Sequence, residues 1–184
     1  MSKIGIFMAD GCEEIEGLTV VDLLRRASIE VEMISIGDSK MVKGSHGIKF
    51  EADKLKTEVD MNSFDGVVLP GGMPGTKNLE KNEFVQETLK KFNNENKLIA
   101  AICAAPSVLA GLGLLKGKKA TSYPGFDVKM QESVYLENHV VVDGNIITSR
   151  GVGTAIEFAL EITKYFIDEQ TTINLAESIV FQTA

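Results

Sequence analysis

One cysteine stands where a strand pattern gives way to a helix pattern. Residues 98–102 form an apolar run with the length of a buried central strand, and a helical pattern begins at Ser107, after Pro106. Cys103 lies at the turn between them. A sharp strand-to-helix turn around one reactive side chain is the nucleophile-elbow arrangement, in which backbone N–H groups and the helix dipole stabilise a thiolate. The alternative is a buried structural cysteine, since free cysteines are common in protein cores.

A second candidate is Glu16, in the helix that we predict over residues 13–27. Acids in the first turn of a helix are favoured by its dipole, so Glu13, Glu14 and Glu16 can be interpreted as three solvated carboxylates. On a wheel of 100° per residue, however, Glu16 lies within roughly 40° of the apolar stripe, whereas Glu14 lies on nearly the opposite side. The members of that stripe are Val20, Leu23 and Ala27. A carboxyl group on a buried face must be protonated or paired, and a protonated one can donate to a thiolate and transfer protons. We therefore favour a functional role for Glu16.

Two glycines follow another predicted buried strand, residues 65–69. At Gly71 and Gly72 the backbone can pass close to a ligand, and its free N–H groups could form an oxyanion hole. A plain turn is the alternative interpretation. The pair does not belong to a phosphate-binding loop, because the required lysine and hydroxyl residue do not follow it.

The other candidate residues point less clearly to chemistry. Cys12 is next to the acidic turn, which should raise its pKa and make it a poor nucleophile. His46 and His139 lie in predicted strand or loop positions, where we expect surface or interface roles rather than catalysis. Cysteines and histidines are too far apart in sequence for a zinc motif, so we predict no metal. The run Arg-Gly-Val-Gly-Thr at 150–154 predicts a tight turn with Thr154 near the N-cap of a long helix.

These residues are carried by alternating strand and helix patterns. The predicted strands are 3–8, 29–36, 65–69, 98–102 and 119–123, followed by a hairpin of 139–142 with 145–149 around Asp143-Gly144. The predicted helices are 13–27, 82–95, 107–112, 153–166 and a short one from about 168 to 180, while the polar stretch 37–63 is predicted to hold an edge strand or a hairpin near 47–52. This order predicts one α/β domain over residues 1–184, with a mostly parallel sheet and helices on both faces. Sites in such folds lie at the carboxyl ends of the strands, where Cys103, the two glycines and the 10–16 loop would meet.

Composition excludes several classes of function. The 184 residues carry 19 basic and 26 acidic side chains, a formal charge of −7, so binding to nucleic acid or to an anionic membrane surface is not expected. No apolar run approaches the length of a membrane span. The first residues enter a strand pattern at once, which predicts no signal peptide. Two cysteines do not make a disulfide framework, and a reducing cytoplasm fits them better.

Four motifs in series point to a family. They are Glu-Glu-Ile-Glu at 13–16, Leu-Pro-Gly-Gly at 69–72, Ala-Ile-Cys-Ala-Ala-Pro at 101–106 and Thr-Ser-Arg-Gly-Val-Gly-Thr at 148–154. In this order they resemble the ThiJ/PfpI superfamily, and most of all its deglycase/glyoxalase branch, which is associated with Parkinson disease. The resemblance extends from Lys3 to about Phe166.

The resemblance implies a flavodoxin-like three-layer sandwich that forms a homodimer and uses no cofactor or metal. By family role, Cys103 is the nucleophile and Glu16 the protonated carboxyl beside it, while the backbone N–H groups of Gly72 and Ala104 bind the oxyanion. Further residues that the resemblance places at the substrate pocket are Gly71, Tyr123, Arg26 and His46.

Relatives often have a histidine where this chain has Tyr123. A peptidase needs an imidazole to protonate its amine leaving group, so that activity is the least favoured. Aldehyde chemistry needs only a thiolate and an acid–base group. The resemblance implies a cofactor-free glyoxalase or deglycase acting on methylglyoxal-type α-oxoaldehydes or their adducts, and the residues present suit that chemistry. The alternative is an oxidative-stress sensor or chaperone that acts through oxidation of Cys103 to the sulfinate.

Overall fold

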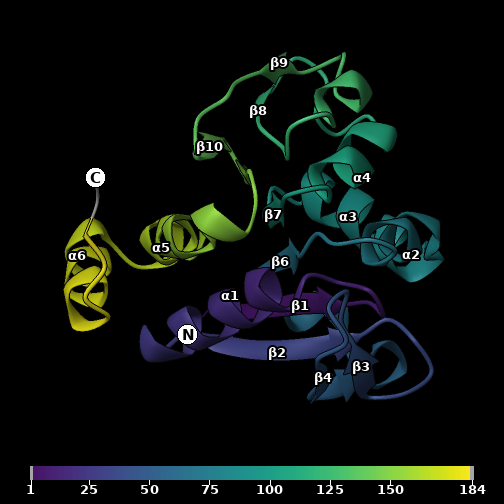
Figure 1. Ribbon diagram of the computed structural model, residues 1–184, viewed down its shortest axis with the longest axis horizontal. Helices are drawn as coiled ribbons and strands as arrows, with labels where there is room; N and C mark the ends of the chain where they lie inside the picture. Colours follow the sequence, from purple (N-terminus) through teal and green to yellow (C-terminus); the bar gives the residue numbers. More distant parts are fainter. Residues whose placement is uncertain (1, 183–184) are drawn as a thin grey trace.

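A seven-stranded sheet forms the centre of the molecule (Figure 1). The structure is a computed structural model, and it describes residues 2–182. Its strand order is β10-β11-β7-β6-β1-β2-β5, and every pair is parallel except the β10–β11 hairpin. The strands are β1 (Lys3–Met8), β2 (Glu30–Ser35), β5 (Lys54–Leu55), β6 (Gly66–Leu69), β7 (Leu98–Ile102), β10 (Val140–Asp143) and β11 (Ile146–Ser149). Every residue of β6, β7 and β11 is buried, as expected for strands covered on both faces.

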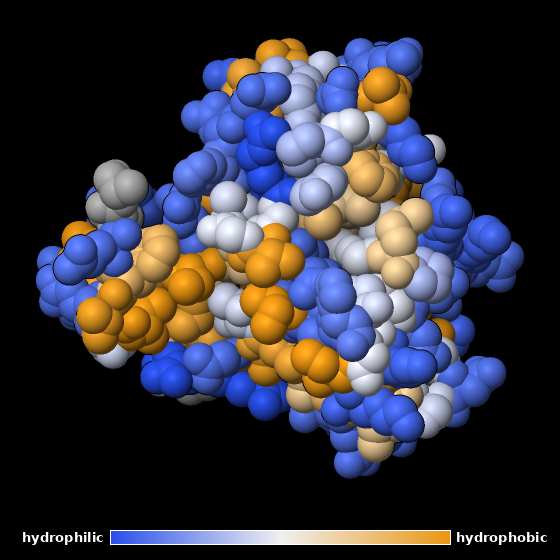
Figure 2. All heavy atoms as spheres, viewed as in Figure 1, coloured by the Kyte–Doolittle hydropathy of each residue, from blue (hydrophilic) through white to orange (hydrophobic). Residues whose placement is uncertain are grey.

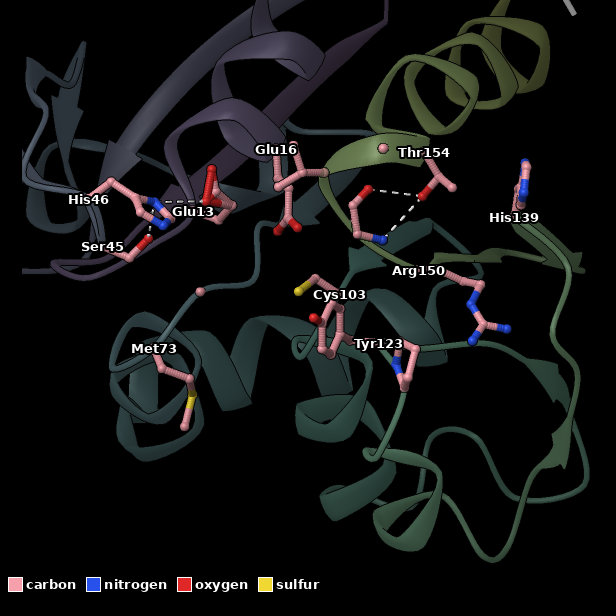
Figure 3. A pocket seen from close by; sticks show the side chains of 15 residues that line it. Glu13, Glu16, Ser45, His46, Met73, Cys103, Tyr123, His139, Arg150 and Thr154 are labelled. Atoms are coloured by element: carbon pink, nitrogen blue, oxygen red, sulfur yellow. Dashed lines mark hydrogen bonds and ion pairs between the residues drawn. The ribbon is translucent and has the colours of Figure 1, made fainter.

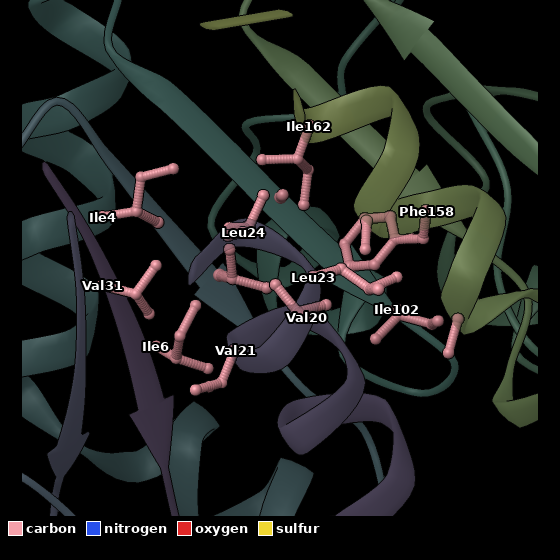
Figure 4. Close-up of a cluster of buried hydrophobic side chains, with 14 of the residues drawn as sticks. Ile4, Ile6, Val20, Val21, Leu23, Leu24, Val31, Ile102, Phe158 and Ile162 are labelled. Carbon is pink, nitrogen blue, oxygen red and sulfur yellow. The ribbon is translucent and has the colours of Figure 1, made fainter. Parts of the chain in front are cut away.

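Helices cover both faces of this sheet. One face carries α1 (Glu14–Arg26) and α5 (Ala155–Phe166), with α6 (Glu169–Ser178) packed on α5; the other carries α2 (Gly75–Lys81), α3 (Glu83–Asn94) and α4 (Pro106–Gly111). Successive strand residues point to opposite faces, so Ile6 joins the α1–α5 core shown in Figure 4, whereas Phe7 joins the core beneath α3. The predicted three-layer, flavodoxin-like α/β fold is confirmed.

Smaller elements lie around the sheet. Of the edge strand or hairpin predicted near 47–52, the structure has the hairpin, formed by β3 (Met41–Lys43) and β4 (Lys49–Glu51). The short strand β8 (Lys119–Ala120) pairs with β9 (Val134–Tyr135). Short 3₁₀ turns are η1 (Lys56–Glu58), η2 (Met61–Ser63), η3 (Asp127–Lys129) and η4 (Val152–Thr154). The strand predicted over 119–123 ends early because the Thr121 N–H donates to the Thr148 side chain, at 2.9 Å, instead of continuing a ladder.

Helix α2 was not predicted from the sequence. Its seven residues contain one large apolar side chain, Leu79, which is fully buried. One apolar residue gives no periodicity, so the helix is set by the tertiary contact of Leu79 rather than by a pattern.

The strand order brings four loop segments together at one edge of the sheet. β6 and β7 are neighbours in the order, flanked by β1 and β11, and all four run in the same direction. The residues that follow them are therefore adjacent: the start of α1 after β1, the Gly71 turn after β6, Cys103 after β7 and Arg150 after β11. No helix within residues 2–182 is long and apolar enough to cross a membrane.

Candidate active site

Cys103 occupies a strained turn that its neighbours hold in place. Its φ angle is 65°, in the left-handed region that non-glycine residues rarely adopt and that costs on the order of 1–3 kcal/mol. The Cys103 N–H donates to the Ser149 carbonyl at 3.0 Å, and the Cys103 carbonyl accepts from the Tyr123 N–H at 2.8 Å. Strain of this kind, fixed from both sides, is the geometry of a nucleophile elbow.

Glu16 lies beside Cys103, on the first turns of α1 (Figure 3). Its side chain is fully buried, and Oε2 accepts the Gly71 N–H at 2.9 Å. The other oxygen, Oε1, has no hydrogen-bond partner among the residues that the structure describes. A Cβ on Gly71 would lie 2.6 Å from the Cys103 Cβ and 2.9 Å from Glu16 Oε2. Only glycine fits there, because the thiol and the carboxyl meet over its α-carbon.

Two backbone N–H groups face the Cys103 sulfur. They belong to Gly72 and Ala104, and both oppose the rise of the Cys103 pKa by donating to the sulfur. Gly72 has φ of +86°, and a Cβ there would lie 2.3 Å from the Glu13 nitrogen. The tight β6–α2 turn therefore needs glycine at this position, and it directs the Gly72 N–H group toward the Cys103 sulfur.

The two acids are coupled. Burial raises the pKa of Glu16 to about 7, although the Gly71 N–H and the contact with Cys103 oppose this rise. Burial also raises the pKa of Cys103 to about 12, and the charge of Glu16 adds to this effect. The acidic thiol predicted from the elbow is thus absent while Glu16 is ionised. When Glu16 is protonated, its charge no longer opposes the thiolate and its O–H can donate to sulfur, so the ionisation of each group depends on that of the other.

The second cysteine, Cys12, lies in the loop before α1, as predicted, but it is fully buried. Its pKa is raised to about 12, first by burial and then by the charge of Glu14. The prediction named only the neighbouring acids as the cause. Cys103, in contrast, is partly exposed and lines a cavity, so a small molecule in that cavity can reach the thiol of Cys103 but not that of Cys12.

A cavity of about 720 Å³ opens above Cys103. Two residues that the family resemblance placed there, His46 and Tyr123, line it. Gly71, which the resemblance also placed there, does not line it, and its N–H donates to Glu16. Arg26 is a correction: it lies near the end of α1, pairs with Asp22 at 2.7 Å and lines a different hollow.

The structure also corrects the predicted position of Glu14. The helical wheel placed it on the solvent side of α1, yet its side chain is 1% exposed. The turn after β3 folds over it, and its carboxylate accepts the N–H groups of His46 at 2.9 Å and Ile48 at 3.3 Å. Burial raises the pKa of Glu14, but these donors and the His46 ring outweigh it and hold that pKa below its ordinary value.

One group of side chains has the composition of a metal site. Glu13, Glu14 and His46 offer ligand atoms that all lie within 4.8 Å of one another. Their hydrogen bonds account for the arrangement, since Glu14 is bonded to the loop backbone and the His46 ring pairs with both carboxylates, at 3.2 and 3.3 Å. The pairing raises the pKa of His46, first through Glu14.

Two further residues of the cavity were not predicted as site residues. Arg150 and His139 line its wall on the side away from His46 (Figure 3). The motif 148–154 indicated a turn at Arg150, and the position directly after a buried strand was the signal that could have placed this side chain at the site.

Comparisons with known proteins agree with the fold. A family model described as the DJ-1/PfpI family matches residues 2–165. Protein DJ-1 homolog B of Arabidopsis thaliana is 42% identical over 177 residues, which is 96% of this chain but 40% of that relative's length. The glutathione-independent glyoxalase DJ-1 of Schizosaccharomyces pombe is 33% identical over 172 residues, covering 88% of this chain and 90% of the relative.

A solved structure has the same fold as this chain. The crystal structure of Drosophila melanogaster DJ-1beta has a TM-score of 0.95 and 37% sequence identity, and the match covers 100% of both chains. On the family model and these relatives, the chain belongs to the DJ-1/PfpI family.

Proposed function

We propose that this protein is a cofactor-free glyoxalase that converts α-oxoaldehydes of the methylglyoxal type to 2-hydroxy acids, or removes them from adducts. The observation that carries the proposal is the Glu16–Cys103 pair: a buried carboxyl with one unpartnered oxygen beside a thiol at a strained elbow. The name of the fission yeast relative supports the same reaction class.

The first step uses the thiol and the backbone donors. The Cys103 thiolate adds to the aldehyde carbon, forming a C–S bond, and the aldehyde oxygen becomes an oxyanion that accepts from Gly72 and Ala104. Protonated Glu16 then gives its proton to this oxygen, so the product is a hemithioacetal and Glu16 is left as a carboxylate. No group leaves in this step, so a histidine acid is not needed.

The second step uses Glu16. As a carboxylate, Glu16 takes the proton from the former aldehyde carbon and returns it to the adjacent ketone carbon, while the hydroxyl proton of the hemithioacetal passes to the ketone oxygen. The first carbon is thereby oxidised to a thioester and the second is reduced to an alcohol. Water then hydrolyses the thioester, releasing the 2-hydroxy acid and the thiol. The redox change is internal to the substrate, so no external oxidant or cofactor is consumed.

The test is lactate production from methylglyoxal. Wild-type protein should form lactate, and Cys103→Ser should abolish it, since serine is far less acidic and no histidine is placed to activate it. Cys12→Ser is the matched control and should retain activity, because Cys12 is buried away from the cavity. Wild-type protein that forms no lactate and restores no glycated amine would refute the proposal.

A second function, redox sensing, has an observation of its own in its favour. Cys103 is a partly exposed thiol beside a protonatable carboxyl and two N–H donors, groups that can bind the oxygens of a sulfinate. If sensing is the role, mild peroxide should add two oxygen atoms to Cys103, and Glu16→Gln should slow this accumulation. The same rate in both proteins would remove Glu16 from that role.

Peptidase activity remains the least favoured, since the two histidines that line the cavity both pair with glutamates.

We also propose that the protein acts as a homodimer, on the strength of the family resemblance. Figure 2 shows apolar residues gathered over the region of α1, α5 and α6. A hollow there is lined by Leu18, Ile156 and Val180, of which Val180 is 83% exposed. Sedimentation at micromolar concentration should give the mass of two chains, and a monomer would contradict the proposal.

A further inference from the structure

Arg150 differs from the other arginines of the chain. Arg25 pairs with Asp53 and Arg26 pairs with Asp22, each at 2.7 Å. The Arg150 guanidinium instead donates only to the Glu137 carbonyl, at 3.0 Å, and no carboxylate within residues 2–182 lies within 4.0 Å of it. In a chain with 26 acidic side chains, this leaves one half-buried cation on the wall of the cavity without a counter-ion.

The charged groups around Arg150 do not supply that counter-ion. Glu157 is held by the His139 ring at 3.1 Å and lines the neighbouring hollow rather than this cavity. Glu13 lies on the opposite side, where it pairs with His46 at 3.3 Å (Figure 3). Between the two sides, Glu16 and Cys103 lie at the reacting centre.

The backbone of the same wall also favours a negative group. Val152, Gly153 and Thr154 line the cavity and form the turn η4 that leads into α5, so the positive end of this helix's dipole lies on the Arg150 side. An arginine fork near a helix start suits a carboxylate, which it can bind through two parallel N–H···O bonds.

We propose that Arg150 binds a carboxylate at the far end of the substrate, so that the preferred substrates are α-oxoaldehydes whose carbon chain ends in a carboxylate. The inference rests on the proposed glyoxalase function and specifies its substrate class. The reaction is the one given above: an acid of the form OHC–CO–CH₂CH₂–COO⁻ takes up water and becomes 2-hydroxyglutarate, with one carbon oxidised and its neighbour reduced. The cavity of about 720 Å³ has room for such a molecule.

The test compares two substrates that differ in one charge, 4,5-dioxopentanoate and its methyl ester. Wild-type protein should prefer the acid in kcat/KM. Arg150→Gln should lose on the order of tenfold or more of kcat/KM for the acid and much less for the ester, since a charge-assisted bond is lost in one case only. The matched control is Lys116→Gln, which removes one positive charge from an exposed site that lines a different hollow. It should preserve the preference.

Equal kcat/KM for acid and ester in the wild type, or an equal loss for both in Arg150→Gln, would overturn the inference and leave the glyoxalase proposal standing. Binding of the product gives a readout that does not depend on turnover. 2-Hydroxyglutarate should bind the wild type and Lys116→Gln alike by calorimetry, and Arg150→Gln at least tenfold more weakly. A protein that binds it in this Arg150-dependent way yet turns over neither aldehyde refutes the glyoxalase proposal and supports the carboxylate site. Binding that is absent, or that Arg150→Gln does not weaken, refutes the site.

Discussion

Glu14 and Glu16 are two glutamates of one helical turn with opposite electrostatic behaviour. Both side chains are buried, at 1% and 0% exposure. The pKa of Glu14 is lowered, whereas that of Glu16 is raised to about 7. Burial is the largest single influence on each and acts in the same direction on both, so it does not explain the difference.

The difference lies in the number of donors. The Glu14 carboxylate accepts from two backbone N–H groups, the Ser45 hydroxyl and the His46 ring, whereas Glu16 accepts one N–H and leaves Oε1 without a partner. A satisfied carboxylate stays charged and ties a loop to a helix. An unsatisfied one holds a proton near neutral pH and has an oxygen free to use it. We therefore expect Glu14 to have a structural role, whereas Glu16 is the residue that we propose for proton transfer.

The largest expected effect is on turnover. Glu16→Gln should lower kcat for methylglyoxal by about 10²–10⁴-fold, because the amide fills the same volume but transfers no proton. Glu14→Gln, the matched control, should stay within about tenfold of the wild type, since Glu14 does not line the cavity. Lactate formation measured under conditions where both variants are folded checks this. Turnover that survives Glu16→Gln, or fails equally in both variants, would break the proposed contrast.

The next effect is on the pH dependence of stability. Between the ordinary pKa of 4.5 and the folded value of about 7, native Glu16 holds a proton that the unfolded chain has lost. Stability therefore falls as pH rises through this range, by on the order of 3 kcal/mol. Glu16→Gln removes this penalty, so its stability relative to the wild type should increase from pH 4.5 to 7 and then level off. Urea unfolding at several pH values measures the difference, and a difference independent of pH would show that Glu16 ionises normally.

Glu14→Gln should have the reverse pH dependence. Because the folded pKa of Glu14 is lowered, its carboxylate stabilises the protein above the ordinary pKa of 4.5, and this stability is lost as pH falls through the folded pKa. At pH 7 the variant should be less stable by about 1–3 kcal/mol, the cost of leaving buried N–H donors with a poorer acceptor. Glu132→Gln, at a 66% exposed position, is the surface control and should change little. Equal unfolding midpoints for Glu14→Gln and wild type at pH 7 would contradict the structural role.

The features that could be predicted from the sequence are those that follow from hydrophobic periodicity and from the order of strands and helices. The wheel placed Glu16 on the buried stripe of α1, and the alternation of patterns predicted the layers of the sandwich. The same wheel wrongly predicted that Glu14 is exposed. A helical wheel identifies only the side of the helix that packs on the sheet, whereas here a loop of residues 44–48 buries the opposite side as well. Arg26 was placed by resemblance alone, and its own pairing with Asp22 removes it from the pocket of this chain.

The pKa of Cys103 and the ion pairing of Arg150 could not be predicted, because both depend on residues that are neighbours only in the folded protein. The elbow predicted an acidic Cys103, since N–H donors and a helix dipole can be read from the sequence, whereas burial and the adjacent Glu16 charge cannot. Arg150 lay within a recognised motif, yet its lack of a carboxylate partner is a property of the folded surface.

The smallest expected effect concerns Tyr123, which stands where relatives often have a histidine. Its phenol is at the cavity, and its ring packs over Gly151, where a Cβ would lie 3.3 Å from the ring. The contact that holds the elbow is the Tyr123 N–H to the Cys103 carbonyl, which any residue supplies. Tyr123→Phe should therefore keep the elbow and lose one hydrogen bond to substrate, lowering kcat/KM for methylglyoxal by about tenfold or less. Tyr123→Ala, which also uncovers Gly151, is the companion variant and should lose more. A loss near that of Glu16→Gln in Tyr123→Phe would mean that the phenol takes part in proton transfer, and the division between one chemical carboxyl and its supporting residues would have to include it.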